Sequence, residues 1–293
     1  MAGSASLYAG PSRGRAGPPI IGPMARGSPG RARTSARRRP RQILALGGGG
    51  FTEEPDNPAL DEYVLASSGR DRPRVCFMAT AGGDNPSYTV KFYNAFSGGH
   101  CDPSHLALFN RTVDDARSLL LAQDVIYVGG GNTVNLLAVW RAQAIDEILR
   151  EAWERGVVLA GLCAGSMCWF EGGVTASFGR RLTPLEDGLG FLPGSNCPHY
   201  GARRDAYTEA LHAGLSPGIA ADDGVALHFV DQRLAAVVAS RPGPRAYRGG
   251  VAGGRVVEAP LRPAVIDGRM ALRARNDAPP EADSAPAALV AVV

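Results

Sequence analysis

The chain has 293 residues, of which 45% are hydrophobic and 20% are charged, and its formal net charge is +3. It contains no run of about 18 apolar residues, which excludes a membrane-spanning helix. Its composition also excludes collagen-like and wholly disordered proteins.

The positive charge is confined to the start of the chain. Residues 1–41 contain nine arginines and no Asp or Glu, and subtracting these nine from +3 leaves −6 for residues 42–293. We therefore expect residues 1–41 to be a disordered, arginine-rich extension, and the folded part to bind no nucleic acid. The apolar stretch Ile43–Leu46 is too short for the core of a secretory signal.

The cysteines indicate reduced thiols in a cytoplasmic protein, because their number is odd and the chain is too long to need disulfides. They are Cys76, Cys101, Cys163, Cys168 and Cys197. Cys197 lies two positions before His199, but the sequence has no second pair with zinc-type spacing. We expect neither a metal nor another cofactor.

From residue 42 onward, short apolar strands alternate with helical patterns. In chain order these are strand Gln42–Leu46, strand Arg74–Thr80, helix Ser87–Phe96, strand Leu106–Phe109, helix Val113–Leu121, strand Asp124–Val128, a helix capped by Asn132 or Thr133, helix Ala144–Arg155 and strand Val157–Leu162. Continuous apolar strands separated by amphipathic helices are typical of a parallel sheet covered on both faces. The pattern predicts one α/β domain over residues 42–265.

After about residue 172 the pattern loosens into loops rich in Gly and Pro. A helix is predicted near Asp205–Ala213, and Gly224–Val230 with Leu234–Ala239 are predicted to form an antiparallel pair. Residues 266–293 are rich in Ala and Pro and are predicted to be a disordered tail.

The most informative segment is Val157–Ser166, in which an apolar strand runs into G-x-C-x-G around Cys163. We expect a helix over Met167–Glu171 behind it. This is the pattern of a nucleophile elbow, whose glycines avoid clashes in a strained strand-to-helix turn. The helix N-terminus would lower the pKa of the thiol. The alternative is an inert cysteine in a tight turn.

Two further segments could complete such a site. The glycines after strand Asp124–Val128 offer bare N–H groups that could bind an oxyanion together with the N–H of Ala164. They could equally form an ordinary turn or a phosphate-type anion site. His199 lies 36 residues after Cys163 in a loop fixed by Pro198. It could serve as the base, since base and nucleophile need only meet in space, or it could be structural.

Taken together, these motifs resemble the peptidase E (α-aspartyl dipeptidase) family, to which cyanophycinase is related. The matching segments are Gly47–Phe51, Tyr127–Thr133, Ala164–Gly173, Gly188–Tyr200 and Asp222–Phe229. The resemblance covers roughly residues 42–260. It implies a class-I glutamine-amidotransferase-like three-layer α/β sandwich with a mainly parallel sheet. It also implies hydrolysis of small peptides by a serine nucleophile and a histidine base, with N-terminal aspartate as the best-known target.

The resemblance also assigns roles to single residues. Cys163 stands at the position of the family's serine and His199 at that of its histidine. The predicted oxyanion donors are Gly130 or Gly131, together with Ala164. The predicted substrate-binding residues are Arg203 or Arg204, which would recognise an acidic side chain, and Asn132.

Two departures from the family pattern matter. Cys163 replaces the serine, and Ala176 stands where many relatives carry an Asp that orients the histidine. A Cys–His pair tolerates the loss of the orienting acid better than a Ser–His pair does, because its ion pair needs no strong base. Asp223, Asp222 or Glu171 could supply the missing carboxylate instead.

Three hypotheses follow. The first is a peptidase E-like hydrolase that cleaves small peptides, such as Asp-X, through an acyl-enzyme on Cys163. The second is a catalytically altered relative that binds a peptide or acyl ligand, or performs other acyl chemistry. The third is a glutamine-amidotransferase-like thiol enzyme, although no acid stands two residues after His199. We expect a small peptide as the partner, no nucleic acid or membrane, and a monomer or homodimer.

Overall fold

A mainly parallel sheet of eight strands forms the centre of the fold. The computed structural model describes residues 39–266, so the predicted extension and tail lie almost wholly outside the described part. The strands are β1 (Gln42–Leu46), β2 (Arg74–Met78), β3 (Asp102–His105), β4 (Val125–Val128), β5 (Val158–Leu162), β10 (Val225–Val230), β11 (Arg233–Ala239) and β14 (Ala264–Val265). Their order across the sheet is β14-β11-β10-β1-β5-β4-β2-β3. The five strands from β1 to β3 in this order are parallel to one another, and β10 pairs antiparallel with β1 and with β11.

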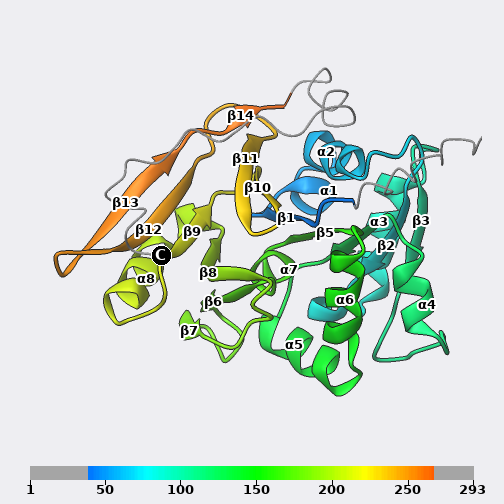
Figure 1. Cartoon of the computed structure of the whole chain (residues 1–293), viewed down its shortest axis with the longest axis horizontal. Coiled ribbons are helices and arrows are strands. Elements are labelled where there is room, and N and C mark those ends of the chain that lie inside the picture. Colours follow the sequence, from blue (N-terminus) through cyan, green and yellow to red (C-terminus); the bar gives the residue numbers. More distant parts are fainter. Residues whose placement is uncertain (1–38, 267–293) are drawn as a thin grey trace, which may run out of the picture. The chain divides into compact units, whose positions relative to one another are not determined.

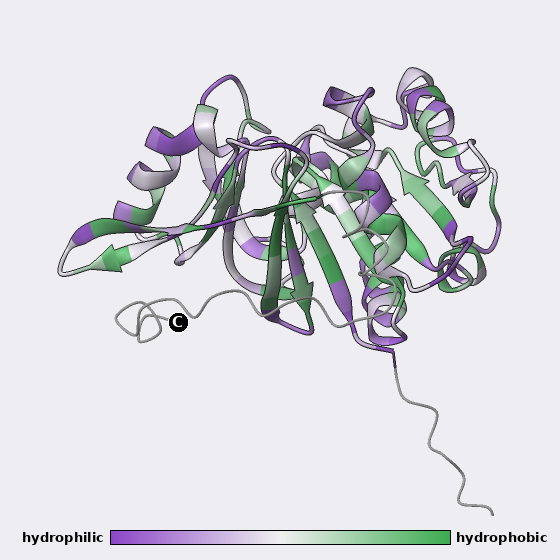
Figure 2. Ribbon diagram, turned by 90° about the horizontal axis from the view of Figure 1, so that it is seen from above, coloured by the Kyte–Doolittle hydropathy of each residue, from purple (hydrophilic) through white to green (hydrophobic). Residues whose placement is uncertain are grey.

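Helices cover both faces of this sheet (Figure 1). One face packs against α1 (Gly50–Glu53), α2 (Ala59–Ser67) and α3 (Pro86–Phe96), and the other against α4 (Ala116–Leu121), α5 (Thr133–Ala142) and α6 (Ile145–Glu154). Successive strand residues alternate between the two cores, as Ile43 and Leu44 do in β1. The sheet strands are largely hydrophobic and the helices carry hydrophilic residues (Figure 2). The predicted three-layer α/β sandwich is confirmed.

The third strand lies earlier in the chain than predicted. The edge strand is Asp102–His105, which pairs with β2, and not Leu106–Phe109. The apolar residues Leu106 and Leu108 are buried, but they lie in the loop that follows. The N–H groups of Leu108 and Phe109 donate to the carboxylate of Asp84 at 2.5 and 2.9 Å, which takes the place of a strand ladder.

A second sheet of six strands occupies the segment that was predicted to be mostly loops. Its strands are β6 (Phe170–Thr175), β7 (Thr183–Leu185), β8 (Leu192–Pro198), β9 (Gly218–Ala221), β12 (Ala246–Ala252) and β13 (Arg255–Leu261), and α8 (Tyr200–His212) packs against it. The predicted helix Met167–Glu171 is wrong: the helix after Cys163 is α7 (Ala164–Met167), and Glu171 belongs to β6. The predicted antiparallel pair of β10 and β11 is confirmed. Within residues 39–266, no helix is both long and apolar enough to cross a membrane.

His228 is a buried structural histidine in β10. Its Nδ1 accepts a hydrogen bond from the Tyr63 hydroxyl at 2.9 Å, and its Nε2–H donates to Gln42 Oε1 at 3.0 Å. Burial lowers the pKa of His228 to about 4. The unfolded chain therefore takes up a proton near pH 6.5, whereas the folded chain does so only near pH 4. We expect the contribution of His228 to the free energy of unfolding to fall by roughly 3 kcal/mol as the pH drops through this window.

Chemical denaturation at several pH values, for wild type and His228→Gln, measures this contribution. The comparison is needed because Asp61 has the opposite effect: burial raises its pKa to about 7, so its contribution falls as the pH rises. As the pH falls from 7 to 4, the free energy of unfolding of His228→Gln should therefore rise relative to that of wild type, because the stabilising protonation of Asp61 is no longer offset by His228. Identical pH profiles for the two proteins would contradict the prediction.

Candidate active site

Cys163 sits at a strained turn between β5 and α7. Its φ and ψ are 54° and −112°, a positive φ that non-glycine residues seldom adopt. The turn is tight: a Cβ on Gly161 would lie 2.1 Å from the carbonyl oxygen of Gly165. A Cβ on Gly165 would lie 2.4 Å from the Val128 carbonyl oxygen, so both glycines of the G-x-C-x-G pattern are needed to form the predicted elbow. The Cys163 side chain remains partly exposed, whereas the other four cysteines are buried.

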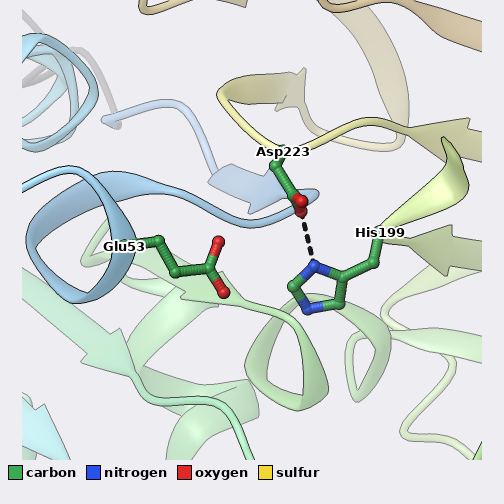
Figure 3. Close-up of side chains that lie close together, drawn as sticks. All are labelled: Glu53, His199 and Asp223. Atoms are coloured by element: carbon green, nitrogen blue, oxygen red, sulfur yellow. Dashed lines mark hydrogen bonds and ion pairs between the residues drawn. The ribbon is translucent and has the colours of Figure 1, made fainter. Parts of the chain in front are cut away.

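His199 and Asp223 form a hydrogen-bonded pair beside Cys163. His199 follows β8 with a φ of 55° and directly precedes the first turn of α8. Its Nδ1–H donates to Asp223 Oδ1 at 2.5 Å, from the turn between β9 and β10 (Figure 3). The imidazole is also hydrogen-bonded to the Cys163 thiol. Three residues from three separate parts of the chain thus form a thiol–imidazole–carboxylate chain.

The glycine run after β1 holds this pair together. The His199 N–H donates to the Gly47 carbonyl at 2.9 Å, and the Gly224 N–H donates to the Gly48 carbonyl at 3.1 Å. A Cβ on Gly48 would lie 2.2 Å from Asp223 Oδ1 and 2.8 Å from His199 Cε1. Only glycine fits there. No local sequence pattern indicates that this glycine run holds His199 beside Asp223.

Electrostatics favour a thiolate–imidazolium pair. Burial raises the pKa of Cys163, but the hydrogen bond and charge of His199, with smaller contributions from Arg203 and the Gly131 N–H, bring it below its usual value. The hydrogen bonds to Asp223 and Cys163 raise the pKa of His199 to about 10. The thiol is therefore poised to lose its proton to the imidazole, which makes it a nucleophile near neutral pH.

The predicted oxyanion donors differ in availability. The Gly130 N–H donates to the Tyr88 hydroxyl at 2.9 Å and is already used. The Gly131 N–H is also engaged, but its partner is Cys163 itself. Ala164 is the first residue of α7, directly after Cys163. Of the two glycines proposed as donors, Gly131 is the one that faces the sulfur.

A cavity of about 240 Å³ opens beside the sulfur. Its lining residues are Gly131, Asn132, Thr133, Cys163, Ala164, Met167, Thr175, Ala176, Ser177 and Arg203. Arg203 is the only charged residue in this set, and it also donates to the Val174 carbonyl at 3.4 Å. Asn132 uses its amide to cap α5 and to bind the Ser177 carbonyl. The cavity is therefore small and polar, with one cation on its wall.

Other predicted residues have partners elsewhere. The guanidinium of Arg204 pairs with Glu258 and lies over the rings of Tyr200 and Tyr247. Glu171 accepts a hydrogen bond from the Gly194 N–H at 2.8 Å. Asp222 accepts one from the Arg245 N–H at 2.9 Å. Of the three acids considered as partners of His199, Asp223 is the one that bonds to it.

Glu53 was not anticipated. Its carboxylate points toward the His199 ring (Figure 3), and the ligand atoms of Glu53, His199 and Asp223 lie within 4.8 Å of one another. Glu53 Oε2 accepts a hydrogen bond from the Gly49 N–H at 2.7 Å. Of the two carboxylates, Asp223 is the one hydrogen-bonded to the imidazole. Glu53 is best described as a neighbouring carboxylate, anchored to the glycine run.

Known proteins resemble this chain in sequence and in fold. The family model described as peptidase family S51 matches residues 43–237. The uncharacterized peptidase YgaJ of Bacillus subtilis (strain 168) is 52% identical over 225 residues, which cover 75% of this chain and 97% of that protein. A solved structure of a peptidase from an acI-B1 Actinobacterium has a TM-score of 0.60 at 18% identity, covering 77% of this chain and 96% of that one. This last likeness concerns the fold.

Proposed function

The chain belongs to peptidase family S51, and from this premise we propose that it is a thiol-dependent peptidase in which Cys163 is the nucleophile and His199 the acid–base group. The observation that carries the proposal is the bonding of His199 to both Cys163 and Asp223. Enzymes that form an acyl intermediate commonly use this arrangement, with the nucleophile next to a base that a third group orients.

The reaction proceeds in two steps. The Cys163 thiolate attacks the scissile carbonyl carbon, and the N–H groups of Gly131 and Ala164 bind the resulting oxyanion. The His199 imidazolium donates its proton to the leaving amine, the C–N bond breaks, and a thioester remains. Water then attacks the thioester while His199 accepts its proton, which releases the carboxylic acid and restores the thiolate–imidazolium pair.

Asp223 supports hydrolysis over the alternative of a protein that only binds its ligand. That alternative was motivated by Ala176, which lines the cavity where relatives were expected to carry an orienting acid. The carboxylate on His199 comes instead from the turn before β10. In this proposal Asp223 is the orienting acid, supplied from another position in the chain.

We infer that the substrates are small peptides with an acidic N-terminal residue. The small size of the cavity suits a short side chain, and the guanidinium of Arg203 on its wall suits a carboxylate. Asp-X dipeptides fit both features.

Arg203→Gln should reduce kcat/KM for Asp-X dipeptides by roughly 10- to 100-fold, the value of one hydrogen bond to a charged group, and should change Asn-X cleavage little. Arg204→Gln, on the same helix but paired with Glu258, is the matched control and should retain the preference for Asp-X. The measurement is peptide hydrolysis by the three proteins. Equal loss on Asp-X and Asn-X would contradict the role of Arg203, and no hydrolysis of any peptide by wild type would contradict the proposed function.

A further inference from the structure

We propose that Tyr88 is a positioning residue: its hydroxyl fixes the glycine loop after β4 so that the Gly131 N–H faces the Cys163 sulfur. The proposal rests on the proposed function of Cys163 as nucleophile. Tyr88 belongs to α3, more than 40 residues before the glycine loop, and no sequence motif connects the two.

The Tyr88 hydroxyl holds the glycine loop by a hydrogen bond from outside the reaction site. Tyr88 Oη accepts the Gly130 N–H at 2.9 Å. The ring lies directly against Gly129, where a Cβ would be 2.8 Å from Tyr88 Cε1. The phenol therefore contacts two consecutive residues of the loop, one through its ring and one through its oxygen.

The tyrosine is itself held rigidly. It is the third residue of α3, whose start is fixed by Pro86 and by the Asn85 side chain, which accepts the Ser87 N–H. Its ring packs against Phe51 and Phe77, with centroid separations of 5.9 and 5.1 Å. An acceptor on such a ring has little freedom to move, so it can define the plane of the Gly129–Gly130 peptide.

The Gly129–Gly130 peptide lies next to Cys163. A Cβ on Gly130 would lie 3.0 Å from Cys163 Cβ, so the loop packs directly on the cysteine. The next N–H, that of Gly131, is bonded to the sulfur and helps to lower the pKa of Cys163. On the far side, the Asn132 N–H donates to the Ala81 carbonyl at 2.8 Å. The Gly131 N–H is thus aimed by two anchors, Tyr88 before it and Ala81 after it.

Tyr88→Phe tests this role, because it keeps the ring and removes only the acceptor. The freed Gly130 N–H should loosen the loop and weaken the Gly131 hydrogen bond to the thiolate. We expect the pH profile of Cys163 alkylation to move to higher pH. We also expect kcat for peptide hydrolysis to fall roughly tenfold, as the loss of a buried hydrogen-bond partner implies, with KM within a factor of two.

Tyr93→Phe is the matched control. It removes a hydrogen bond of the same length, 2.9 Å to His105 Nδ1, from the same helix. It should leave both the alkylation profile and kcat at wild-type values. If Tyr88→Phe behaves like Tyr93→Phe, the proposal is overturned.

A second variant keeps the proposal testable if Tyr88→Phe does not fold. Gly129→Ala keeps the hydroxyl but pushes the ring from the loop, and should shift the alkylation profile in the same direction. Circular dichroism and thermal unfolding show whether each variant is folded. The alkylation experiment needs no substrate, so it separates the two proposals. A shifted alkylation profile with no peptide cleavage by wild type would reject the proposed peptidase function and support the positioning role of Tyr88. An unshifted profile with normal cleavage would reject the positioning role of Tyr88 and support the peptidase function.

Discussion

Cys163→Ala is expected to reduce kcat/KM for peptide hydrolysis by roughly 10⁴-fold or more, because no other group on the cavity wall can form the acyl intermediate. Among the remaining hydroxyls of the cavity, Ser177 Oγ is hydrogen-bonded to Thr175 Oγ1 and not to a histidine. Activity is measured on the best Asp-X peptide. Cys163→Ser restores the family's nucleophile in an active site that lacks the preformed ion pair, and should fall between wild type and Cys163→Ala.

Alkylation followed by intact-mass measurement gives an independent readout. Near pH 6, wild type should take up one adduct rapidly and Cys163→Ser none, because a thiolate alkylates far faster than a thiol. Burial raises the pKa of Cys76 and of Cys197 to about 12, so neither competes. Cys168→Ala, behind the elbow, is the control and should label as wild type does. Labelling that survives in Cys163→Ser, or activity that survives in Cys163→Ala, would refute the assignment.

Asp223→Asn is expected to reduce kcat by roughly 10²- to 10³-fold, less than in a serine triad, because the thiolate needs a weaker base. The carboxylate is the largest cause of the raised pKa of His199, about 10 in wild type. Its removal lowers that pKa toward 6.5. A histidine with a raised pKa keeps its proton up to that value, so the alkaline limit of activity should move down in the variant. The rates of hydrolysis and of alkylation, measured across pH for wild type and Asp223→Asn, test the expected loss of kcat and the expected shift of the alkaline limit.

Glu53→Gln is the matched control for Asp223→Asn. It neutralises a second carboxylate within 4.8 Å of the same cluster, one that is bonded to the Gly49 N–H and not to the imidazole. Its effect on kcat should stay within about threefold, as expected for an exposed charge. Equal losses in the two variants would mean that the local negative charge matters and the Asp223 hydrogen bond does not.

The parts of the site that the sequence predicts are those encoded locally. The turn at Cys163 needs a glycine on either side, so its pattern is complete within five residues. His199 was identified from a motif that a family resemblance made specific. Asp223 was only one of three possible acids, because its contact with His199 depends on β10 pairing beside β1, which no local pattern encodes. Tyr88 was missed for the same reason.

The fold was predictable where periodicity was strong. The parallel strands carry continuous apolar runs, and the alternation with helices predicts the larger sheet. The second sheet was missed because its strands are short of apolar residues: β8 reads LPGSNCP and β12 reads AYRGGVA. Tertiary pairing, rather than propensity, makes these segments strands.

The position of β1 has a consequence for the newly made chain. β1 is the first strand of the sandwich and lies between β5 and β10, pairing Gln42 with Val230 across nearly the whole domain. Synthesis delivers Cys163 first, then His199, and then Asp223, some 60 residues after Cys163. Such distant pairing forms late. A nascent chain on the ribosome is therefore expected to lack the contact between His199 and Asp223 until β10 has paired with β1.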